Sequence, residues 1–433
     1  YVKRIQMGLD LLNKEYDWVG NLTRELDGRG YANIYTYNAE NRVTQKRDSY
    51  NTIDYTYDGI GNLIRESNVL GQKVEYIYDE QNNLVQTKKF IDDVQFVQAD
   101  MQYDGFGRVI VSTDYEGNQT NFTYNLLGEV STQRDSFGKV TIYNYDTNGN
   151  LSGVLQPRAL GNASLRNTNG HTVSYEYDEA NRKIKEINAD NKETAYFYNA
   201  NGTIDHTIDR QNADDSQSDH VITYDYDALN RILSQTDAYD NDVNFVYDDI
   251  GNLTRQTDEL GRVSEYEYDA FSRKVVDRDP LGNVTRYTYD ENGNILRTTY
   301  PDLTVTNYVY NDVNQVTRIE DNSGNATVYG YDAVGNKTTE TDKRGNTTSF
   351  VYDKLNRLET ETNSQATVTT YTYDNNGNKL SQSVEGTVTG FVYDALNRVT
   401  EIMHPGNKSE SYSYDSEGHV LTHADGNEAA NIT

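Results

Sequence analysis

The stretch that decides the fold spans residues 279–299 and reads DPLGNVTRYTYDENGNILRTT. From Val284 to Tyr289, β-branched and aromatic residues alternate with polar ones, which is the period-2 pattern of a half-buried β-strand. A turn rich in Asp, Asn and Gly follows, and Ile295 opens a second run that reads as the returning strand. The stretch therefore predicts a β-hairpin and the link to the next hairpin.

The same unit recurs along the whole chain of 433 residues. A Tyr followed by Asp or Asn ends the first strand of the unit 19 times, and 13 of the 18 intervals between these tyrosines are 21 residues long. A period this constant is typical of one small unit stacked on itself. A sheet of so many strands accumulates twist and curls. We therefore predict an all-β fold in which residues 1–433 form a single continuous array of about 19 tandem hairpin repeats, each about 21 residues long, in a long coiled antiparallel sheet.

The turn of each unit has a clear chemical pattern. Asp at its first position can accept hydrogen bonds from backbone NH groups, and Gly or Asn at its fourth position tolerates positive φ. Two tyrosines that are two residues apart, such as Tyr287 and Tyr289, must point to the same face of their strand. We predict that the following residues are structural positions of the repeat: Tyr57, Asp58, Gly61, Asn62, Tyr268, Asp269, Tyr289, Asp290, Gly293, Asn294, Tyr331, Asp332, Gly335 and Asn336.

The composition argues against several functional classes. The chain carries 68 acidic and 39 basic residues, and its formal charge of −29 repels the phosphates of nucleic acids and of anionic lipids. No apolar run approaches the ~20 residues of a membrane span. Its 38 tyrosines argue against disorder, although only 35% of the residues are hydrophobic. We expect a folded, heavily solvated protein that binds no nucleic acid and inserts into no membrane.

No group of residues in the sequence has the pattern of a catalytic or metal-binding site. There are no cysteines and six histidines, and His419 and His423, which are four residues apart, lie in a segment that reads as strand and turn. The turn at residues 146–150 resembles the start of a calcium loop, but it lacks the distal Glu of an EF-hand, and turn chemistry accounts for its residues. We expect no cofactor, no metal site and no enzymatic activity.

Three intervals exceed the period, and their extra residues lie near 88–99, 156–171 and 205–220. Because the repeat resumes after each one, the sequence predicts loop insertions within one array and not domain boundaries. Loops on a rigid scaffold can carry recognition, although surface decoration without a role is the commoner explanation.

Motifs such as YTYDGIGNL at residues 55–63 and YDALNRV at residues 393–399 recur over essentially the whole chain. These repeats resemble those of the YD-repeat or Rhs family, which includes bacterial polymorphic toxins, shell components of insecticidal toxin complexes and teneurins. The resemblance implies a β-sheet that spirals into a hollow shell or barrel, often with a toxic C-terminal domain inside. Toxins of the family also carry a self-cleaving segment that ends in Asp-Pro-x-Gly-Leu. Residues 279–282 match only its start and lie in an ordinary repeat turn, so we expect no cleavage there.

The leading expectation is therefore a structural role. The chain would be a wall segment in the β-shell of an exported bacterial Rhs-type protein, located outside the cell or on its surface. Its partners would be flanking parts of the same polypeptide or an encapsulated toxin domain or other cargo. The alternative is an adhesion module that recognises surface glycans or a partner protein through its outer face or inserted loops. Both ends interrupt the array, so we also expect exposed strand edges to favour edge-to-edge association of like copies.

Overall fold

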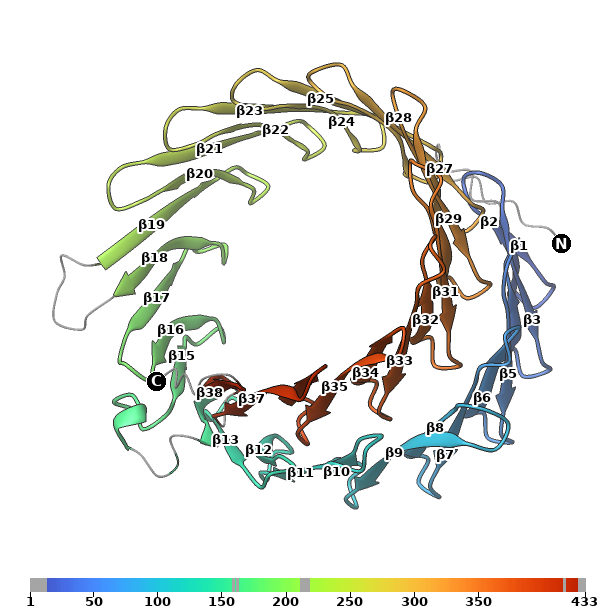
Figure 1. The fold of residues 1–433 in the computed structure, drawn as a ribbon. Helices are drawn as coiled ribbons and strands as arrows, with labels where there is room; N and C mark the ends of the chain where they lie inside the picture. Colours follow the sequence, from blue (N-terminus) through green and yellow to red (C-terminus); the bar gives the residue numbers. More distant parts are fainter. Residues whose placement is uncertain (1–13, 158–159, 161–162, 211–218, 416–417, 427–433) are drawn as a thin grey trace. The chain divides into compact units, whose positions relative to one another are not determined.

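The structure is a computed structural model that describes residues 14–157, 160, 163–210, 219–415 and 418–426. In these ranges the chain forms 38 β-strands, which belong to one antiparallel sheet, and a short 3-10 turn, η2 (Ala163–Leu165). Hairpin follows hairpin along the chain (Figure 1). The prediction of an all-β array of tandem hairpins is confirmed.

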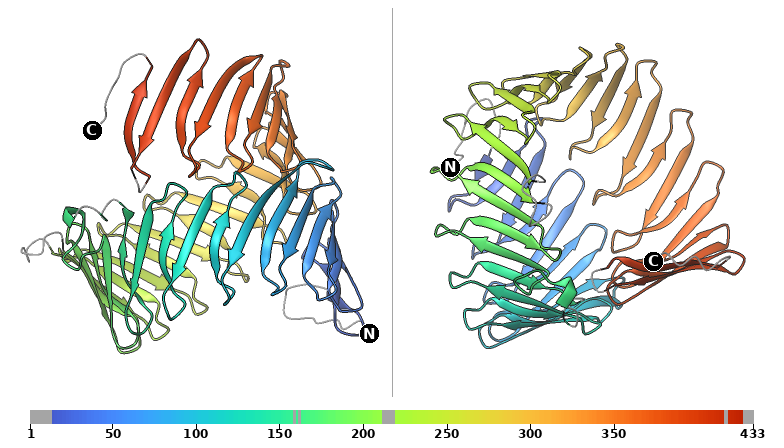
Figure 2. Two further views of the ribbon diagram at one scale, coloured as in Figure 1. Left: turned by 90° about the horizontal axis from the view of Figure 1, so that it is seen from below. Right: turned by 90° about the vertical axis from the view of Figure 1, so that its left-hand side faces the viewer.

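The chain forms two compact units. Within the described ranges, unit 1 comprises residues 14–119, 286–411 and 424–426, and unit 2 comprises residues 120–285 and 412–423. Figure 2 shows the hairpins standing side by side within each unit.

The strands that lie wholly in unit 1 are β1 (Lys14–Tyr16), β2 (Leu22–Leu26), β3 (Ala32–Tyr37), β4 (Val43–Arg47), β5 (Thr52–Tyr57), β6 (Leu63–Asn68), β7 (Lys73–Tyr78), β8 (Leu84–Phe90), β9 (Phe96–Tyr103), β10 (Val109–Thr113), β26 (Ile295–Thr299), β27 (Val305–Tyr310), β28 (Val316–Asp321), β29 (Ala326–Tyr331), β30 (Lys337–Thr341), β31 (Thr347–Tyr352), β32 (Leu358–Thr362), β33 (Val368–Tyr373), β34 (Lys379–Val384), β35 (Thr387–Tyr393) and β36 (Val399–His404). Those wholly in unit 2 are β12 (Val130–Arg134), β13 (Val140–Tyr145), β14 (Leu151–Leu155), β15 (Val173–Tyr177), β16 (Lys183–Asn188), β17 (Glu193–Tyr198), β18 (Ile204–Arg210), β19 (Asp219–Tyr226), β20 (Ile232–Thr236), β21 (Asp242–Tyr247), β22 (Leu253–Thr257), β23 (Val263–Tyr268) and β24 (Lys274–Arg278). Strands with residues in both units are β11 (Gln119–Tyr124), β25 (Val284–Tyr289), β37 (Lys408–Tyr414) and β38 (Val420–Asp425).

The hairpins share one irregularity of register at the end of each Tyr strand. In the pair β5–β6, Tyr55 lies opposite Glu66, whereas Tyr57 lies opposite Leu63, because the register shifts by one residue before Tyr57. The pair β29–β30 has the same shift immediately before Tyr331. A type I turn that is closed by a residue at positive φ places such a bulge beside the turn. The turn sequence therefore sets the register of every hairpin.

The sheet has no thick hydrophobic core. In the part of the chain that the structure describes, four hydrophobic residues are buried, namely Val97, Leu155, Ile187 and Ala195. Along β25, Tyr287 and Tyr289 are half-buried, whereas Arg286 and Thr288 are exposed. The two rings therefore lie on the same face, as predicted, and the sheet is stabilised mainly by contacts along that face.

The insertion near residues 156–171 packs against the sheet of unit 2. Buried Asn167 donates through Nδ2 to the Ser174 hydroxyl at 2.8 Å and to the Ile187 carbonyl at 2.9 Å. His171 Nε2 lies 2.7 Å from Asn144 Nδ2. These bonds tie the insertion to β13, β15 and β16, and residues 158–159 and 161–162 of the insertion lie outside the described ranges.

The other two insertions lengthen hairpins. Most of residues 88–99 lie in β8 and β9, which pair as far as Phe90 and Phe96. Strands β18 and β19 pair as far as Arg210 and Asp219, and residues 211–218 between them lie outside the described ranges. The longer β8–β9 hairpin contributes Lys89 and Val97 to a cavity of unit 1.

Candidate functional site

The second Tyr of each pair ties its strand to the preceding hairpin. Tyr57 donates through its hydroxyl to the carbonyl of Val43, the first residue of β4, at 2.8 Å, and Tyr331 donates to that of Val316, the first residue of β28, at 2.8 Å. Partial burial raises the pKa of Tyr331. Tyr289 occupies the same repeat position with a half-buried ring. The equivalent bond is made by Tyr37, Tyr78, Tyr103, Tyr145, Tyr177, Tyr198, Tyr268, Tyr310, Tyr352, Tyr373 and Tyr393.

The Asp after this Tyr closes the turn. Asp58 Oδ1 accepts from the NH of Ile60 at 3.0 Å and from that of Asn62 at 2.9 Å, while Asn62 Nδ2 donates to Asp58 Oδ2 at 3.0 Å. Gly61 has a φ of 107°. Desolvation raises the pKa of Asp58, but hydrogen bonds from Asn62, Gly61 and Ile60 outweigh it, so the pKa lies below its usual value. The same geometry holds for Asp290, Gly293 and Asn294 and for Asp332, Gly335 and Asn336.

Other residue types also occupy the positive-φ position. In the turn after Tyr268, Arg273 Nε donates to Asp269 Oδ2 at 2.7 Å, and Ser272 has a φ of 60°. Leu303 and Ala366 have φ values of 68° and 62°. Neither of these two is a residue type that favours positive φ, so the surrounding repeat imposes the conformation.

Asn side chains link one turn to the next along the same edge of the sheet. Asn294 Nδ2 donates to Asn314 Oδ1 at 2.7 Å, and Asn336 Nδ2 donates to Asn356 Oδ1 at 2.8 Å. Each acceptor is the positive-φ residue of the following turn. The edge of the sheet is therefore a row of hydrogen-bonded turns.

Two segments of unit 1 that are far apart in sequence meet through such turns. We call this contact the seam. It joins the turns at residues 27–31, 68–72 and 114–118 to the turns at residues 290–294, 311–315, 353–357 and 374–378.

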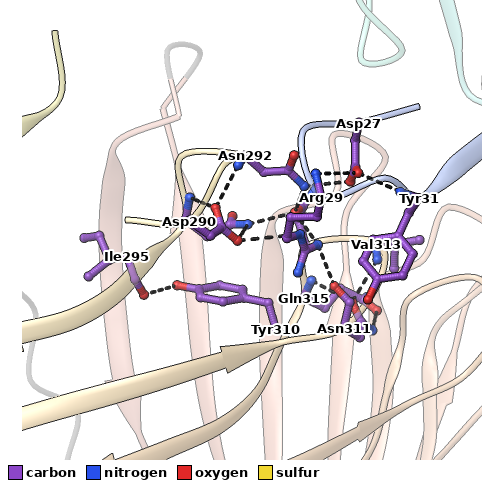
Figure 3. Close-up of polar contacts among 12 residues, drawn as sticks. Asp27, Arg29, Tyr31, Asp290, Asn292, Ile295, Tyr310, Asn311, Val313 and Gln315 are labelled. Carbon is purple, nitrogen blue, oxygen red and sulfur yellow. Dashed lines mark hydrogen bonds and ion pairs between the residues drawn. The ribbon is translucent and has the colours of Figure 1, made fainter. Parts of the chain in front are cut away.

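The most buried part of the seam surrounds Arg29 (Figure 3). Arg29 Nη2 donates to the Asn311 carbonyl and to Asn314 Oδ1, both at 2.7 Å, and its Nε lies 3.6 Å from Asp290 Oδ2. The side chains of Arg29 and Asp290 are only 14% and 5% exposed. A buried charge that loses its partner is strongly destabilising, so this pair stabilises the contact between the two turns.

The turn at residues 27–31 also approaches its partner closely. Asn292 Nδ2 donates to Asp27 Oδ2 at 2.6 Å. A Cβ atom added at Gly28 would lie 2.6 Å from the Glu291 carbonyl oxygen, so only glycine fits without a shift of the backbone. The Tyr31 hydroxyl hydrogen-bonds to Asp312, which raises the pKa of Tyr31.

The seam continues at two further places. Gln72 Nε2 donates to Asn356 Oδ1 at 2.6 Å, and the Lys354 ammonium donates to the carbonyl of Leu70. Further along, Asn376 Nδ2 donates to Asp114 Oδ2 at 2.8 Å. Hydrogen bonds from the side chains of one turn to the side chains or backbone of another thus recur along both segments.

Of the residues selected from the sequence, Asp290 takes part directly in the seam. Four residues of the seam were not predicted from the sequence, namely Asp27, Arg29, Gln72 and Lys354. A second glycine in the turn is no specific signal, because Gly59 occupies the same turn position as Gly28 and has open space around it.

The described residues place no three His, Cys, Asp or Glu side chains where they could hold a metal ion. His419 is largely exposed and lies 2.9 Å from Asp415, and the His423 ring stacks on Tyr412 at 4.6 Å between centroids. Within the described ranges, no helix has the length and apolar character needed to cross a membrane.

An all-β array with Asp-closed turns and Tyr-anchored strands defines the chain as a β-hairpin repeat protein. The family model described as Teneurin YD-shell matches residues 65–264 and 261–429, and the chain therefore belongs to this family. The family assignment made from the repeats is confirmed.

The chain also resembles several solved structures. The TcdB2-TccC3 crystal structure has a TM-score of 0.65 and 14% identity, over 96% of this chain and 28% of that one. A Tc holotoxin pore from Photorhabdus luminescens and TcdB2-TccC3 without its hypervariable C-terminal region each have a TM-score of 0.64 and 14% identity, over 95% of this chain and 27% of theirs. The chain thus spans just over a quarter of these structures and shares their fold. No curated protein matches the sequence.

Proposed function

We propose that the chain is part of the wall of a hollow β-shell in an exported bacterial protein, and that this shell encloses or scaffolds a toxin or other cargo. The observation that carries the proposal is the seam, where turns of residues 14–119 meet turns of residues 286–411 through a buried Arg29–Asp290 pair. An array whose edges bind other turns of the same chain can form a continuous wall without a separate covering protein.

The membership in the Teneurin YD-shell family and the likeness to TcdB2-TccC3 support this role. One matched structure is described as lacking a hypervariable C-terminal region. We propose that a region of this kind, elsewhere in the full-length protein, is the cargo. The repeat residues Tyr57, Asp58, Tyr331 and Asp332 would then act only in holding the wall together.

The repeat tyrosines give little support to the alternative role in glycan binding. Their rings are half-buried in the sheet, and hydroxyls such as those of Tyr57 and Tyr331 already donate to backbone carbonyls. A sugar that stacked on these rings would have to displace neighbouring side chains. Recognition of glycans would therefore use residues outside the repeat pattern.

Limited proteolysis of the full-length protein tests the proposed wall. In the wild type, a region held inside the shell should resist protease until the protein is denatured. Arg29→Ala should open the seam and increase cleavage of that region, whereas Arg65→Ala, which removes a more exposed arginine paired with Glu75, should not. Cleavage of the region at the same rate in the intact wild type as in the denatured protein would refute the proposal.

A further inference from the structure

A cavity lies on the seam at the place where the β8–β9 insertion approaches the second segment. It has a volume of about 380 Å³ and is lined by residues of both segments of unit 1. The first segment contributes Lys73, Lys89, Val97 and Tyr115, and the second contributes Lys354 and Arg357. The insertion supplies Lys89 and Val97, so its extra length has a structural consequence at this cavity.

The charge of this cavity is opposite to that of the chain. Four of its 13 lining residues are cationic and none is acidic, although the chain has 68 acidic and 39 basic residues. The concentration of positive charge is therefore local, and it cannot be explained by the average composition.

Two of the four cations are already compensated. Arg357 Nε forms an ion pair with Asp353 Oδ2 at 2.6 Å, and Lys73 Nζ lies 3.6 Å from Glu75 Oε1. The other two are Lys89 and Lys354, and among the described residues no carboxylate lies within ion-pair distance of either. Their charges repel one another unless an anion enters the cavity.

Lys89 is held at the cavity by an aromatic ring. Its Nζ lies 4.7 Å from the centroid of the Tyr115 ring, a cation–π contact that positions the ammonium group without neutralising it. Lys354 donates to the carbonyl of Leu70, which fixes its ammonium group at the rim in the same way. Both cations are thus oriented in advance, which lowers the entropy that an incoming anion must remove.

The remaining lining residues indicate the kind of anion. The amide residues Gln72, Asn356, Asn375 and Asn376 also line the cavity, and Val97 and Tyr115 add apolar and aromatic surface to it. Amides hydrogen-bond hydroxyl groups, and apolar and aromatic surfaces pack against the CH face of a sugar ring. A bare phosphate could use the cations and the amide NH2 groups, but it has no CH face to pack against the apolar and aromatic surface. The volume falls in the range of roughly 300–1,000 Å³ that is typical of small-molecule sites.

We propose that this cavity binds a sugar acid, with the carboxylate between Lys89 and Lys354 and the hydroxyl groups on the surrounding amides. The site depends on the seam, because neither segment alone carries both lysines. It does not depend on whether the wall encloses cargo. No covalent step is involved.

Titration calorimetry with D-glucuronate tests the site, with D-glucose and inorganic phosphate as comparison probes. We expect saturable binding of glucuronate, weaker binding of phosphate and none of glucose. Lys89→Gln and Lys354→Gln should each weaken glucuronate binding by about tenfold, since each removes one charged hydrogen-bond partner. The matched control is Lys379→Gln, because Lys379 lies 4.7 Å from the Phe391 ring centroid but does not line the cavity.

Several outcomes would overturn the proposal. Absence of saturable glucuronate binding would show that the cavity binds no sugar acid. Equal binding of phosphate would show that the cavity recognises only the negative charge. Equal losses in the Lys379→Gln variant would place the binding elsewhere. Circular dichroism of each variant checks that the strands persist, and hydrogen exchange at the Arg29 and Tyr31 amides checks that the seam remains closed.

Discussion

The turns after Tyr268 and Tyr289 have nearly the same internal bonds but different surroundings. Asp269 accepts from the backbone NH two residues later at 2.9 Å, and Asp290 does so at the same distance. The Asp269 side chain is 22% exposed and paired with Arg273 of its own turn, whereas that of Asp290 is 5% exposed and faces Arg29 from a distant segment. The repeat sequence therefore specifies the internal hydrogen bonds of the turn, while the neighbouring segment determines how buried the turn is and which residues it contacts.

The largest expected effect follows from removing the carboxylate of Asp290. Asp290→Ala should destabilise the seam by about 3 kcal/mol, because it leaves the Arg29 charge buried without its partner. The Arg29 and Tyr31 amides donate to Asp27 in the turn that faces Asp290. Faster hydrogen exchange at these amides would report that the two turns have separated. Asp269→Ala is the matched control and should leave exchange at these amides unchanged. Equal exchange in both variants would contradict the role assigned to Asp290.

A second test compares two glycines at the same turn position. Gly28→Ala should cost about 2 kcal/mol at the seam, because the added Cβ would press against the Glu291 carbonyl. Gly59 is also the second residue of an Asp turn and has open space around it, so Gly59→Ala should be neutral or slightly stabilising. Hydrogen exchange at the Arg29 and Tyr31 amides distinguishes the two glycine variants. A harmless Gly28→Ala variant would mean that the segments do not approach as closely as described.

Much of the fold could be predicted from the sequence because hairpins depend on local chemistry. The alternation from Val284 to Tyr289 and the Asp-rich turn after it were sufficient to predict the strands and the shared face of the tyrosines. The positive φ of Leu303 could not be predicted, since leucine does not favour that conformation.

The seam could not be predicted for a different reason. All repeats carry similar turns, so the sequence does not distinguish the turn at residues 290–294 from its neighbours. Which turns meet depends on the accumulated twist of many strands and on the lengths of the insertions. Gly28 did not distinguish its turn either, because Gly59 occupies the same turn position and has open space around it.

A third test removes single hydroxyl groups from one strand. Tyr331→Phe should weaken its hairpin by about 1 kcal/mol, because it removes the hydrogen bond to the Val316 carbonyl. Tyr329→Phe is the control in the same strand, since among the described residues the Tyr329 hydroxyl has no hydrogen-bond partner. Hydrogen exchange of the amides in β28 and β29 measures both effects. Similar losses in the two variants would show that ring packing, and not the hydroxyl bond, stabilises the hairpin.

The smallest expected effect concerns pH. The Lys343 ammonium hydrogen-bonds to Asp321 and, with the turn amides, lowers the pKa of Asp321 to about 2 from 3.8. Because the folded pKa is depressed, the stabilisation is present above pH 3.8 and is lost as the pH falls through about 2. Carbon-detected NMR titration should show this low pKa, and Lys343→Gln should raise it. An unchanged Asp321 pKa in that variant would show that Lys343 is not its partner.

The central claim is that residues 14–119 and 286–411 meet in one fixed register, and cross-linking tests it most directly. The chain has no cysteine, so Gln72→Cys with Asn356→Cys provides a single pair of thiols at a seam contact where the native side chains are 2.6 Å apart. The control combines Gln72→Cys with Asn314→Cys, which lies at the equivalent position of a different turn. At low protein concentration a short thiol cross-linker should join the first pair within one chain and leave the second unjoined. Equal cross-linking of the two pairs would contradict the seam.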